Sequence, residues 1–564
     1  MAALLGLACG GPAAPAGRES PHPPADLVLR NGAVYTMDAA RRWASAVAVR
    51  DGRIVYVGPD SLPPGLAGPA TKTVDLAGGM VLPGFQDAHV HPISAGVELG
   101  ECPLVELTTR AALLDSIRAC AAALPEAPWV RGSGWQLPLF ADASPRRELL
   151  DSLVPDRPAA FEAMDGHSLW ANSRALALAG VSGETRDPPD GRIERDPGTG
   201  EPSGTLRESA MELVTRVMPA RTDAELRAGL ARAQREANRF GITSLFAATA
   251  DEAHLRAYTA ADRAGELTVR VAAAAHPDPR EPDSLLSRAR DWRARYTSPR
   301  VRPIAVKLFQ DGVIEARTAA LLAPYLDRKG DPGEPVHDQA TLDRLAAALD
   351  ADGFQIHVHA IGDRAVRMTL DALARARRTN GPRDARHSIT HLQLIDPADI
   401  PRFRSLQVVA NFEALWANGD EYLTRLAEPA LGPARSRWLY PIASVVRSGA
   451  VVSGGSDWSV SSLDPLEAIE MGITHRPAGA PAAPPWNPAE RVDLATMLAL
   501  YTINAAYALH QERETGSIEV GKLADLVVLD RNLFELPPDR IHEARVVRTL
   551  LEGRTVYARG TTPE

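Results

Sequence analysis

The feature that most constrains the fold is an alternation, repeated through the middle of the chain, between short apolar runs and longer amphipathic segments. The apolar runs have the length of strands, and the amphipathic segments have the periodicity of helices. This order is typical of βαβ units in an α/β protein, and eight parallel strands can close into a (β/α)8 TIM barrel. Eight runs qualify as barrel strands: MVLPGFQDAH, TSLFAAT, LTVRVAAAA, RPIAVKLF, FQIHVHA, SITH, LQVVANF and AVVSGGSD.

The chain is longer than a barrel alone requires. Its 564 residues, 45% of them hydrophobic, are enough for a barrel with a large core and a second domain. One strand-like run, PAAFEAM near residue 160, falls outside the count of eight. We therefore assign residues 81–514 to the barrel domain and about 100–235 within it to an insertion.

The two ends of the chain have a different pattern. Residues 25–80 and 515–562 contain short β-rich runs separated by turns, among them the hairpin signals Asn31-Gly32 and Asp51-Gly52. Because both ends have this character and flank the barrel, we predict that they pair into one small β-sandwich.

Charge excludes one class of partner. The formal net charge is −9, and the Lys and Arg residues are scattered along the chain instead of forming a basic stripe. A nucleic acid partner would need such a stripe. We therefore expect a small-molecule substrate and no nucleic acid; a homo-oligomer is compatible with the sequence.

Residues 1–24 form a segment of their own. A short apolar run of small residues ends at Cys9 and is followed by a Gly/Pro/Ala-rich stretch, which resembles a bacterial lipoprotein signal with Cys9 as the lipid anchor. The run is short and lacks a basic beginning, so a plain tail is the alternative. We expect export to the periplasm or a membrane-anchored lipoprotein, and otherwise a cytoplasmic protein. In an exported protein Cys102 and Cys120 could form a disulfide; in the cytoplasm they would be free thiols.

The candidate chemistry begins with FQDAHVHP. His89 and His91 are two residues apart at the end of the first barrel strand, so both imidazoles point to the same face. Such a pair is often only a polar rim position, so it needs further ligands to indicate a metal site.

Lys307 lies inside the apolar strand RPIAVKLF, where a buried ammonium is costly unless it is paired or neutralised. One interpretation is an ion pair with Asp311 or Glu315. The other is a neutral amine that captures CO₂ and becomes a carbamate bridging two metal ions.

Three further residues end later strands. His359 closes FQIHVHA, His391 closes SITH and Asp457 follows AVVSGGS, while His357 lies deeper in its strand and is predicted to pack behind the site. With the His pair and Lys307, these residues fall at the carboxyl ends of strands one, four, five, six and eight. That is the face on which barrel enzymes place their catalytic residues.

These motifs resemble the amidohydrolase superfamily, in the branch of the N-substituted formamide deformylase-like enzymes, from about Asp26 to Tyr557. Two positions depart from the pattern: Thr390 replaces a frequent acidic residue, and Gln86 a frequent Ile. The resemblance rests on these stretches: VLPGFQDAHVHP, WVRGSGW, LDSLVPDRPAAFEAMDGHSLWANSRAL, GEPSGTLRE, VKLFQDG, HAIGDRAV, ITHLQLID and GSDWSVSSLDPL.

The resemblance implies a separate role for each of the metal-site residues. His89 and His91 would hold one Zn²⁺, His359 and His391 a second, and carbamylated Lys307 would bridge them. The expected reaction is cleavage of a carbon–nitrogen bond in an amide, formamide or cyclic amide by a metal-activated hydroxide. Asp457 would orient the attacking group and pass its proton to the leaving amine.

The insertion supplies candidate substrate contacts, namely Trp135, Asp165 and His167, and Arg317 could bind a substrate carboxylate. For Asp165 the alternative is a helix cap, and for Arg317 an ion-paired surface position on a helix.

Three other functions compete with amide hydrolysis. A deaminase on the same barrel usually has a Glu soon after a metal-binding His, but the chain reads AIGDRAV after His359. A non-catalytic scaffold would typically have lost some of the ligands, and a purely structural metal usually has a closed set of Cys and His ligands.

Overall fold

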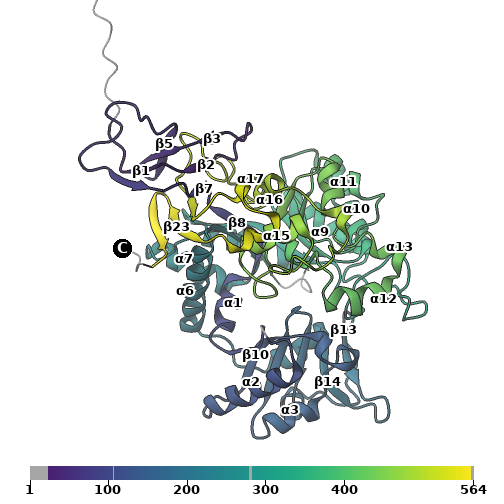
Figure 1. Cartoon of the computed structure of the whole chain (residues 1–564). Helices are drawn as coiled ribbons and strands as arrows, with labels where there is room; N and C mark the ends of the chain where they lie inside the picture. The colour runs from purple at the N-terminus through teal and green to yellow at the C-terminus, as the bar shows by residue number, and fades with distance from the viewer. Residues whose placement is uncertain (1–22, 106, 278–281, 561–564) are drawn as a thin grey trace, which may run out of the picture.

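A computed structural model of the chain describes residues 23–105, 107–277 and 282–560 (Figure 1). Its centre is an eight-stranded parallel sheet in which each strand pairs with the next in chain order. The predicted barrel strands are thereby confirmed, in the predicted order. They are β8 (Phe85–Val90), β15 (Ile242–Ala250), β16 (Arg270–Ala275), β17 (Val301–Phe309), β18 (Gln355–Ala360), β19 (Ser388–His391), β20 (Val409–Phe412) and β21 (Val452–Gly454).

The barrel closes between its first and last strands just beyond the regular sheet. The backbone N–H of Asp457 donates to the carbonyl of His89 over 2.8 Å, and the N–H of Ser456 donates to Asp87 Oδ1 over 3.1 Å. These bonds place the segment after β21 directly beside the end of β8.

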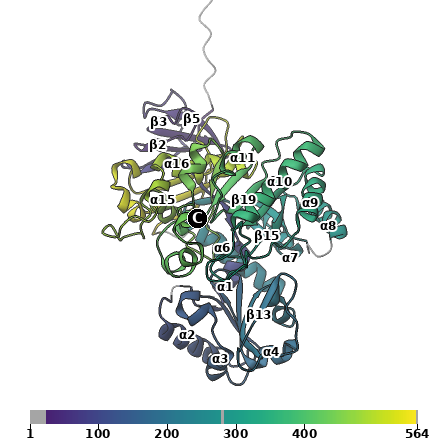
Figure 2. The same ribbon diagram turned by 90° about the vertical axis from the view of Figure 1, so that its right-hand side faces the viewer.

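Helices follow the strands and cover the outside of the barrel (Figure 2). Several begin at a side chain that caps the first turn: Thr222 with Glu225 forms a capping box, and Asp251 and Asp338 cap two further helices. The helices that follow strands are α1 (Pro92–Glu98), α6 (Asp223–Arg239), α7 (Glu252–Arg263), α8 (Pro282–Tyr296), α9 (Gln339–Ala351), α10 (Asp363–Asn380), α11 (Ile400–Leu406) and α14 (Ile442–Arg447). Later segments add α12 (Glu428–Leu431), α13 (Pro433–Ser436), α15 (Pro465–Thr474), α16 (Leu494–Leu500) and α17 (Ile503–Ala508).

Burial on both faces explains why the barrel strands read as continuous apolar runs. In β16, Val271, Ala273 and Ala275 belong to the large core between strands and helices, and Ala272 and Ala274 belong to a separate core of the other face. The small alanines suit the narrow interior of a barrel.

Two sheets built from the ends of the chain form the sandwich, as predicted. β22 pairs antiparallel with β7, so the C-terminal part completes a sheet begun by the N-terminal part. Apolar residues of both ends, such as Val47, Val81 and Leu526, share one core. One sheet contains β1 (Leu27–Arg30), β4 (Ala46–Arg50), β5 (Arg53–Gly58) and β6 (Lys72–Asp75); the other contains β2 (Ala33–Tyr35), β3 (Trp43–Ala44), β7 (Met80–Pro83), β22 (Leu526–Leu529), β23 (Val546–Leu551) and β24 (Arg554–Ala558).

The insertion is a mixed sheet with its own core, on the side of the barrel away from the sandwich (Figures 1 and 2). The run near residue 160 is one of its strands, whereas α6 already packs against the barrel helix α1. Its elements are β9 (Cys102–Pro103), α2 (Arg110–Ala123), β10 (Val130–Trp135), α3 (Arg147–Leu153), β11 (Ala159–Ala163), β12 (Ser168–Ala171), α4 (Ser173–Ala179), β13 (Gly191–Arg195), β14 (Pro202–Glu208) and α5 (Glu212–Thr215).

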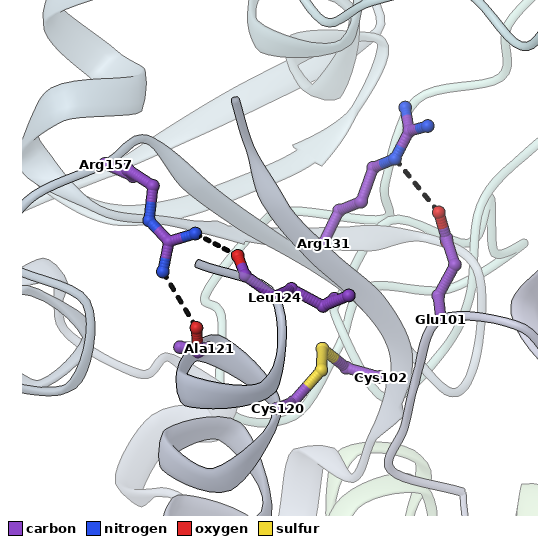
Figure 3. Close-up of a disulfide and its surroundings, with 7 residues drawn as sticks. All are labelled: Glu101, Cys102, Cys120, Ala121, Leu124, Arg131 and Arg157. Atoms are coloured by element: carbon purple, nitrogen blue, oxygen red, sulfur yellow. Dashed lines mark hydrogen bonds and ion pairs between the residues drawn. A yellow bond between two sulfur atoms is a disulfide. The ribbon is translucent and has the colours of Figure 1, made fainter. Parts of the chain in front are cut away.

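A disulfide joins two elements of the insertion (Figure 3). Cys102 of β9 is bonded to Cys120 of α2, with the two Cα atoms 5.8 Å apart. Beside it, the guanidinium of Arg157 donates to the carbonyls of Ala121 and Leu124 and so holds the end of α2. The two cysteines are therefore paired and are not free thiols.

Within the part of the chain that the structure describes, no helix combines the length and the apolar character needed to cross a membrane. The predicted lipid-anchor residue Cys9 lies outside the described residues.

Candidate functional site

The first-strand His pair and the last-strand carboxylate meet at one point. His89 Nε2 lies 3.3 Å and His91 Nε2 lies 3.0 Å from Asp457 Oδ1. His89 is fully buried and Asp457 is almost fully buried. The barrel closure between β8 and β21 thus brings together residues that are far apart in the sequence.

The backbone two residues before Asp457, at Gly455, leaves no room for a side chain. A Cβ added to Gly455 would lie 2.7 Å from His89 Cβ, so a glycine is needed where the two strands approach each other. Asp457 and His391 both have positive φ angles, 52° and 74°. Such conformations cost about 1–3 kcal/mol in a non-glycine residue and are concentrated at functional sites.

His359 and His391 lie on neighbouring strands, with ring centroids 4.6 Å apart. The His391 ring is also 4.7 Å from that of His89, so the imidazoles from strands one, five and six form one group. His391 Nδ1 contacts Glu413 Oε2 at 3.0 Å, and His359 Nε2 contacts the carbonyl of Gly312 at 3.2 Å.

Lys307 lies on β17 with only 1% of its surface exposed, and it lines the same cavity as the histidines. Its Nζ is 4.8 Å from the ring centroid of Phe309 and forms no ion pair within the described residues. Asp311 instead accepts the backbone N–H groups of Ile361, Gly362 and Ala320, and Glu315 accepts from Gln393. The ion-pair alternative for Lys307 is therefore not observed.

Polar groups behind the His group hold His89 in place. His89 Nδ1 is 2.7 Å from His357 Nε2 and 3.0 Å from Thr390 Oγ1. His357 in turn contacts Ser388 Oγ at 2.7 Å, so it packs behind the site as predicted. Since Nδ1 is engaged from behind, Nε2 of His89 is the atom that faces the site.

Burial and charge favour deprotonated ligand atoms. Burial lowers the pKa of His89 and of His359 well below the usual value, which favours the neutral imidazole. Burial opposes ionisation of Asp457, but His89 and His91 hold its pKa well below the usual value. Burial also lowers the pKa of Lys307, to about 8, which leaves an appreciable fraction of neutral amine near neutral pH.

The arrangement fits a metal ion. His89 Nε2 and Asp457 Oδ1 are buried and close together, but neither makes a well-aligned hydrogen bond in the described structure. Donor atoms of His89, His391 and Asp457 all lie within 4.8 Å of one another. Imidazole nitrogen and carboxylate oxygen are the donors that Zn²⁺ and related cations take, and an ion would satisfy His89 Nε2 and Asp457 Oδ1.

A cavity of about 970 Å³ opens over this group and is lined by both barrel and insertion residues. Asp165 and His167 from the insertion line it. His167 Nδ1 contacts Glu208 Oε2 at 2.7 Å, and its ring lies 4.9 Å from that of His359. Although burial acts against it, the charge of Glu208 raises the pKa of His167 to about 9. Asp165 does not cap a helix, because β12 follows it and Asn172 caps α4.

Two of the predicted substrate contacts are corrected by the structure. Trp135 is fully buried in the core of the insertion, where its Nε1 donates to the carbonyl of Phe161, and it does not line the cavity. Arg317 does line the cavity, but it lies in a turn with a φ of 62° and not on a helix. Its guanidinium is engaged by Asp327 at 2.6 Å and by two backbone carbonyls, which matches the ion-paired alternative.

Two carboxylates at the site escaped the sequence analysis. Glu413 directly follows β20, the seventh barrel strand, and is fully buried against His391. Glu208 ends β14 of the insertion and binds both His167 and Thr318. A position directly after a barrel strand was an available signal for Glu413, and Glu208 is the last residue of the family-like stretch GEPSGTLRE.

Comparison with known proteins agrees with this geometry. Residues 72–557 match the amidohydrolase family. The Arabidopsis thaliana protein LONG AFTER FAR-RED 3 is 32% identical over 549 residues, covering 94% of this chain and 92% of the relative. The N-substituted formamide deformylase of Arthrobacter pascens is 29% identical over 552 residues, covering 95% and 98%. An uncharacterized metal-dependent hydrolase from Pyrococcus horikoshii has the same fold, with a TM-score of 0.71 and 23% identity over 91% of this chain and 99% of its own.

Proposed function

Because the chain belongs to the amidohydrolase family, we propose that it is a metal-dependent enzyme that hydrolyses the carbon–nitrogen bond of a small amide. The observation that carries the proposal is the convergence of His89, His91, His391 and Asp457 on a point where two buried donor atoms lack a well-aligned hydrogen bond. This point lies at the carboxyl ends of the barrel strands and opens into a large cavity.

The residues divide into two sets that would hold two divalent ions, with Zn²⁺ the first candidate. His89 and His91 would hold one ion and His359 and His391 the other, and Lys307 would bridge them as a carbamate. The buried and unpaired amine of Lys307 supports this role, because only a neutral amine reacts with CO₂. Bound metal would polarise the amide carbonyl and lower the pKa of water at the site.

Asp457 has the position and charge of the proton carrier. Its carboxylate is ionised, and Oδ1 lies next to His89 Nε2 and His91 Nε2 at the cavity. It would take a proton from the attacking water and give it to the departing nitrogen, so that amide and water become carboxylic acid and amine. His167 is cationic and paired with Glu208. It could therefore donate a hydrogen bond to the carbonyl oxygen of a substrate.

Formamides of primary amines are the first substrates to test, since one relative over nearly the whole chain is an N-substituted formamide deformylase. The test is amine release from a panel of N-formyl, N-acyl and cyclic amides by zinc-loaded protein. We expect turnover of at least one class, loss of turnover in Asp457→Asn, and unchanged turnover in Glu421→Gln, whose side chain is exposed and pairs with Arg425. An inactive wild type, or an Asp457→Asn variant as active as the wild type, would refute the function.

We also propose that the protein is exported, with Cys9 as its lipid anchor. The disulfide between Cys102 and Cys120 supports this, because such bonds persist in oxidising compartments. Mass spectrometry of the mature chain should find a lipidated N-terminal Cys9; an intact Met1 in a cytoplasmic fraction would contradict export.

A further inference from the structure

A second, smaller pocket adjoins the metal-site residues. It has a volume of about 250 Å³, and His359, His391 and Asp457 form one of its walls. A group next to the scissile bond of a substrate would therefore enter this side pocket. The inference below rests on the proposed function and concerns what the side pocket accepts.

Apolar and aromatic side chains form much of the side pocket. Trp416 stacks on the ring of His391, with centroids 5.4 Å apart and an angle of 8° between the planes. Tyr422 connects the pocket to the insertion, because its hydroxyl accepts the backbone N–H of Leu137 over 3.1 Å. Tyr440 and Leu423 complete these walls. Such a surface fits an alkyl or aryl group.

Besides Asp457, three carboxyl groups line the same pocket, and no Lys or Arg does so among the described residues. They are Asp165 from the insertion, Glu315 from the loop after β17 and Asp420, which lies at the exposed side and accepts the backbone N–H of Leu423. His167 also lines the pocket, and its charge is already balanced by its contact with Glu208.

Several polar atoms in the side pocket have no partner. Asp165 Oδ2 is buried and forms no hydrogen bond within the described structure. Tyr440 is only 3% exposed, lines the pocket, and its hydroxyl has no hydrogen-bond partner among the described residues. Glu315 has a single side-chain contact, in which Gln393 Nε2 donates to Oε1 over 2.6 Å. Buried polar atoms are normally satisfied, so the unpaired Asp165 Oδ2, in the same pocket as the Tyr440 hydroxyl and Glu315, points to a bound group with N–H donors.

We propose that the side pocket binds a positively charged substituent of the substrate, a protonated amine carried on an alkyl or aryl group. The ammonium donates to Asp165, Glu315 and the Tyr440 hydroxyl, and the carbon skeleton packs on Trp416 and Tyr422. Aromatic walls add favourable cation–π contact.

The electrostatics of the pocket agree with this assignment. Burial, together with the charges of the neighbouring Asp165 and Asp420, raises the pKa of Glu315 to about 7. Burial also raises the pKa of Asp165. Without a cation these carboxyl groups repel one another, and a bound ammonium removes that repulsion.

The test compares two formamides of equal size, N-[4-(aminomethyl)benzyl]formamide and N-(4-ethylbenzyl)formamide. We expect the wild type to have the higher kcat/KM for the cationic compound. In Glu315→Gln this value falls about tenfold or more, as expected for loss of a hydrogen bond to a charged group, while the neutral compound changes little. Glu421→Gln, one residue from Asp420 but exposed and paired with Arg425, leaves both values unchanged.

Preference of the wild type for the neutral compound, or an equal loss for both compounds in Glu315→Gln, overturns the proposal. Asp420→Asn, which keeps the backbone hydrogen bond to Leu423, carries the test if Glu315→Gln does not fold. If neither formamide is hydrolysed, the proposal is tested by calorimetry, which measures how tightly the protein binds benzylamine and benzyl alcohol. Tighter binding of benzylamine that disappears in Glu315→Gln supports the pocket even though the formamide reaction has failed; equal binding of both compounds refutes it.

Discussion

Glu413 Oε2 lies 3.0 Å from Nδ1 of His391, and both side chains are buried. A carboxylate in this position fixes the orientation of a metal-binding imidazole and raises its basicity. Glu413 also accepts from Thr390, which contacts His89, so one carboxylate is linked to imidazoles of strands one and six.

We predict that Glu413→Gln weakens metal binding by about 10–100-fold, the usual effect of losing such a partner. Zinc titration of the metal-free variant against a chromophoric chelator measures this. Glu421→Gln serves as the control because it removes an exposed carboxylate that pairs with Arg425. Wild-type affinity in Glu413→Gln would show that the contact does not position the ligand.

Lys307→Ala should lose bound metal and activity, because the proposed bridging ligand is absent. Added formate or propionate should restore both in part, since a short carboxylate can occupy the place of a carbamate. Metal analysis and amine release, each with and without the acid, provide the readouts. A variant with unchanged metal stoichiometry and rate would rule out the bridging role.

Arg270, Asp525 and Glu552 join the barrel to the sandwich. Arg270 Nε lies 2.7 Å from Asp525 Oδ2, and Nη2 lies 2.7 Å from Glu552 Oε1. Asp525→Asn should destabilise the protein by about 3–5 kcal/mol, because it leaves a buried guanidinium poorly compensated. Denaturant unfolding measures this. A loss below 1 kcal/mol would mean that the pair does not stabilise the junction.

The same junction predicts a pH dependence. Burial acts to raise the pKa of Glu552, but Arg300 and Arg270 lower it to about 2 from 4.5. A carboxyl group with a lowered folded-state pKa stabilises the protein above pH 4.5, and this contribution, up to about 3 kcal/mol, is lost as the pH falls toward 2. Glu552→Gln should therefore flatten the stability profile in that range. An identical profile for wild type and variant would contradict the assignment.

The disulfide closes a loop between positions 18 residues apart. Cross-links of this length stabilise by about 3 kcal/mol. We expect Cys102→Ser/Cys120→Ser, or treatment with a reductant, to lower the unfolding temperature of the insertion. The double variant should show no further change on reduction; a wild-type unfolding temperature insensitive to reductant would indicate that the bond is absent.

The sequence predicted the barrel, and it predicted which candidate residues lie together at its rim, because both depend on local order. Apolar strands alternate with helices, and parallel strands bring their carboxyl ends together, so His89, Lys307 and Asp457 could be grouped without coordinates. Substrate contacts depend instead on tertiary packing. A buried tryptophan such as Trp135 cannot be distinguished by composition from one that lines a cavity.

Side-chain contacts between different segments of the fold could not be predicted from the sequence either. Arg317 is engaged by Asp327 within an irregular loop, and nothing in the spacing indicates that pair. Glu208 reaches His167 across the insertion sheet, where two strands meet antiparallel. The sequence alone therefore predicts the chemistry of the site, but it does not predict the shape and lining of the pocket around it.

Reconstitution of the metal-free protein tests the central claim most directly. Zn²⁺ is added in steps to wild type and to Asp457→Asn, and amine release from the best formamide is measured at each step. The account predicts that wild-type activity rises with bound metal and saturates near two equivalents, while Asp457→Asn stays inactive at every step. Full activity in the metal-free protein, or equal activity in Asp457→Asn, would contradict it.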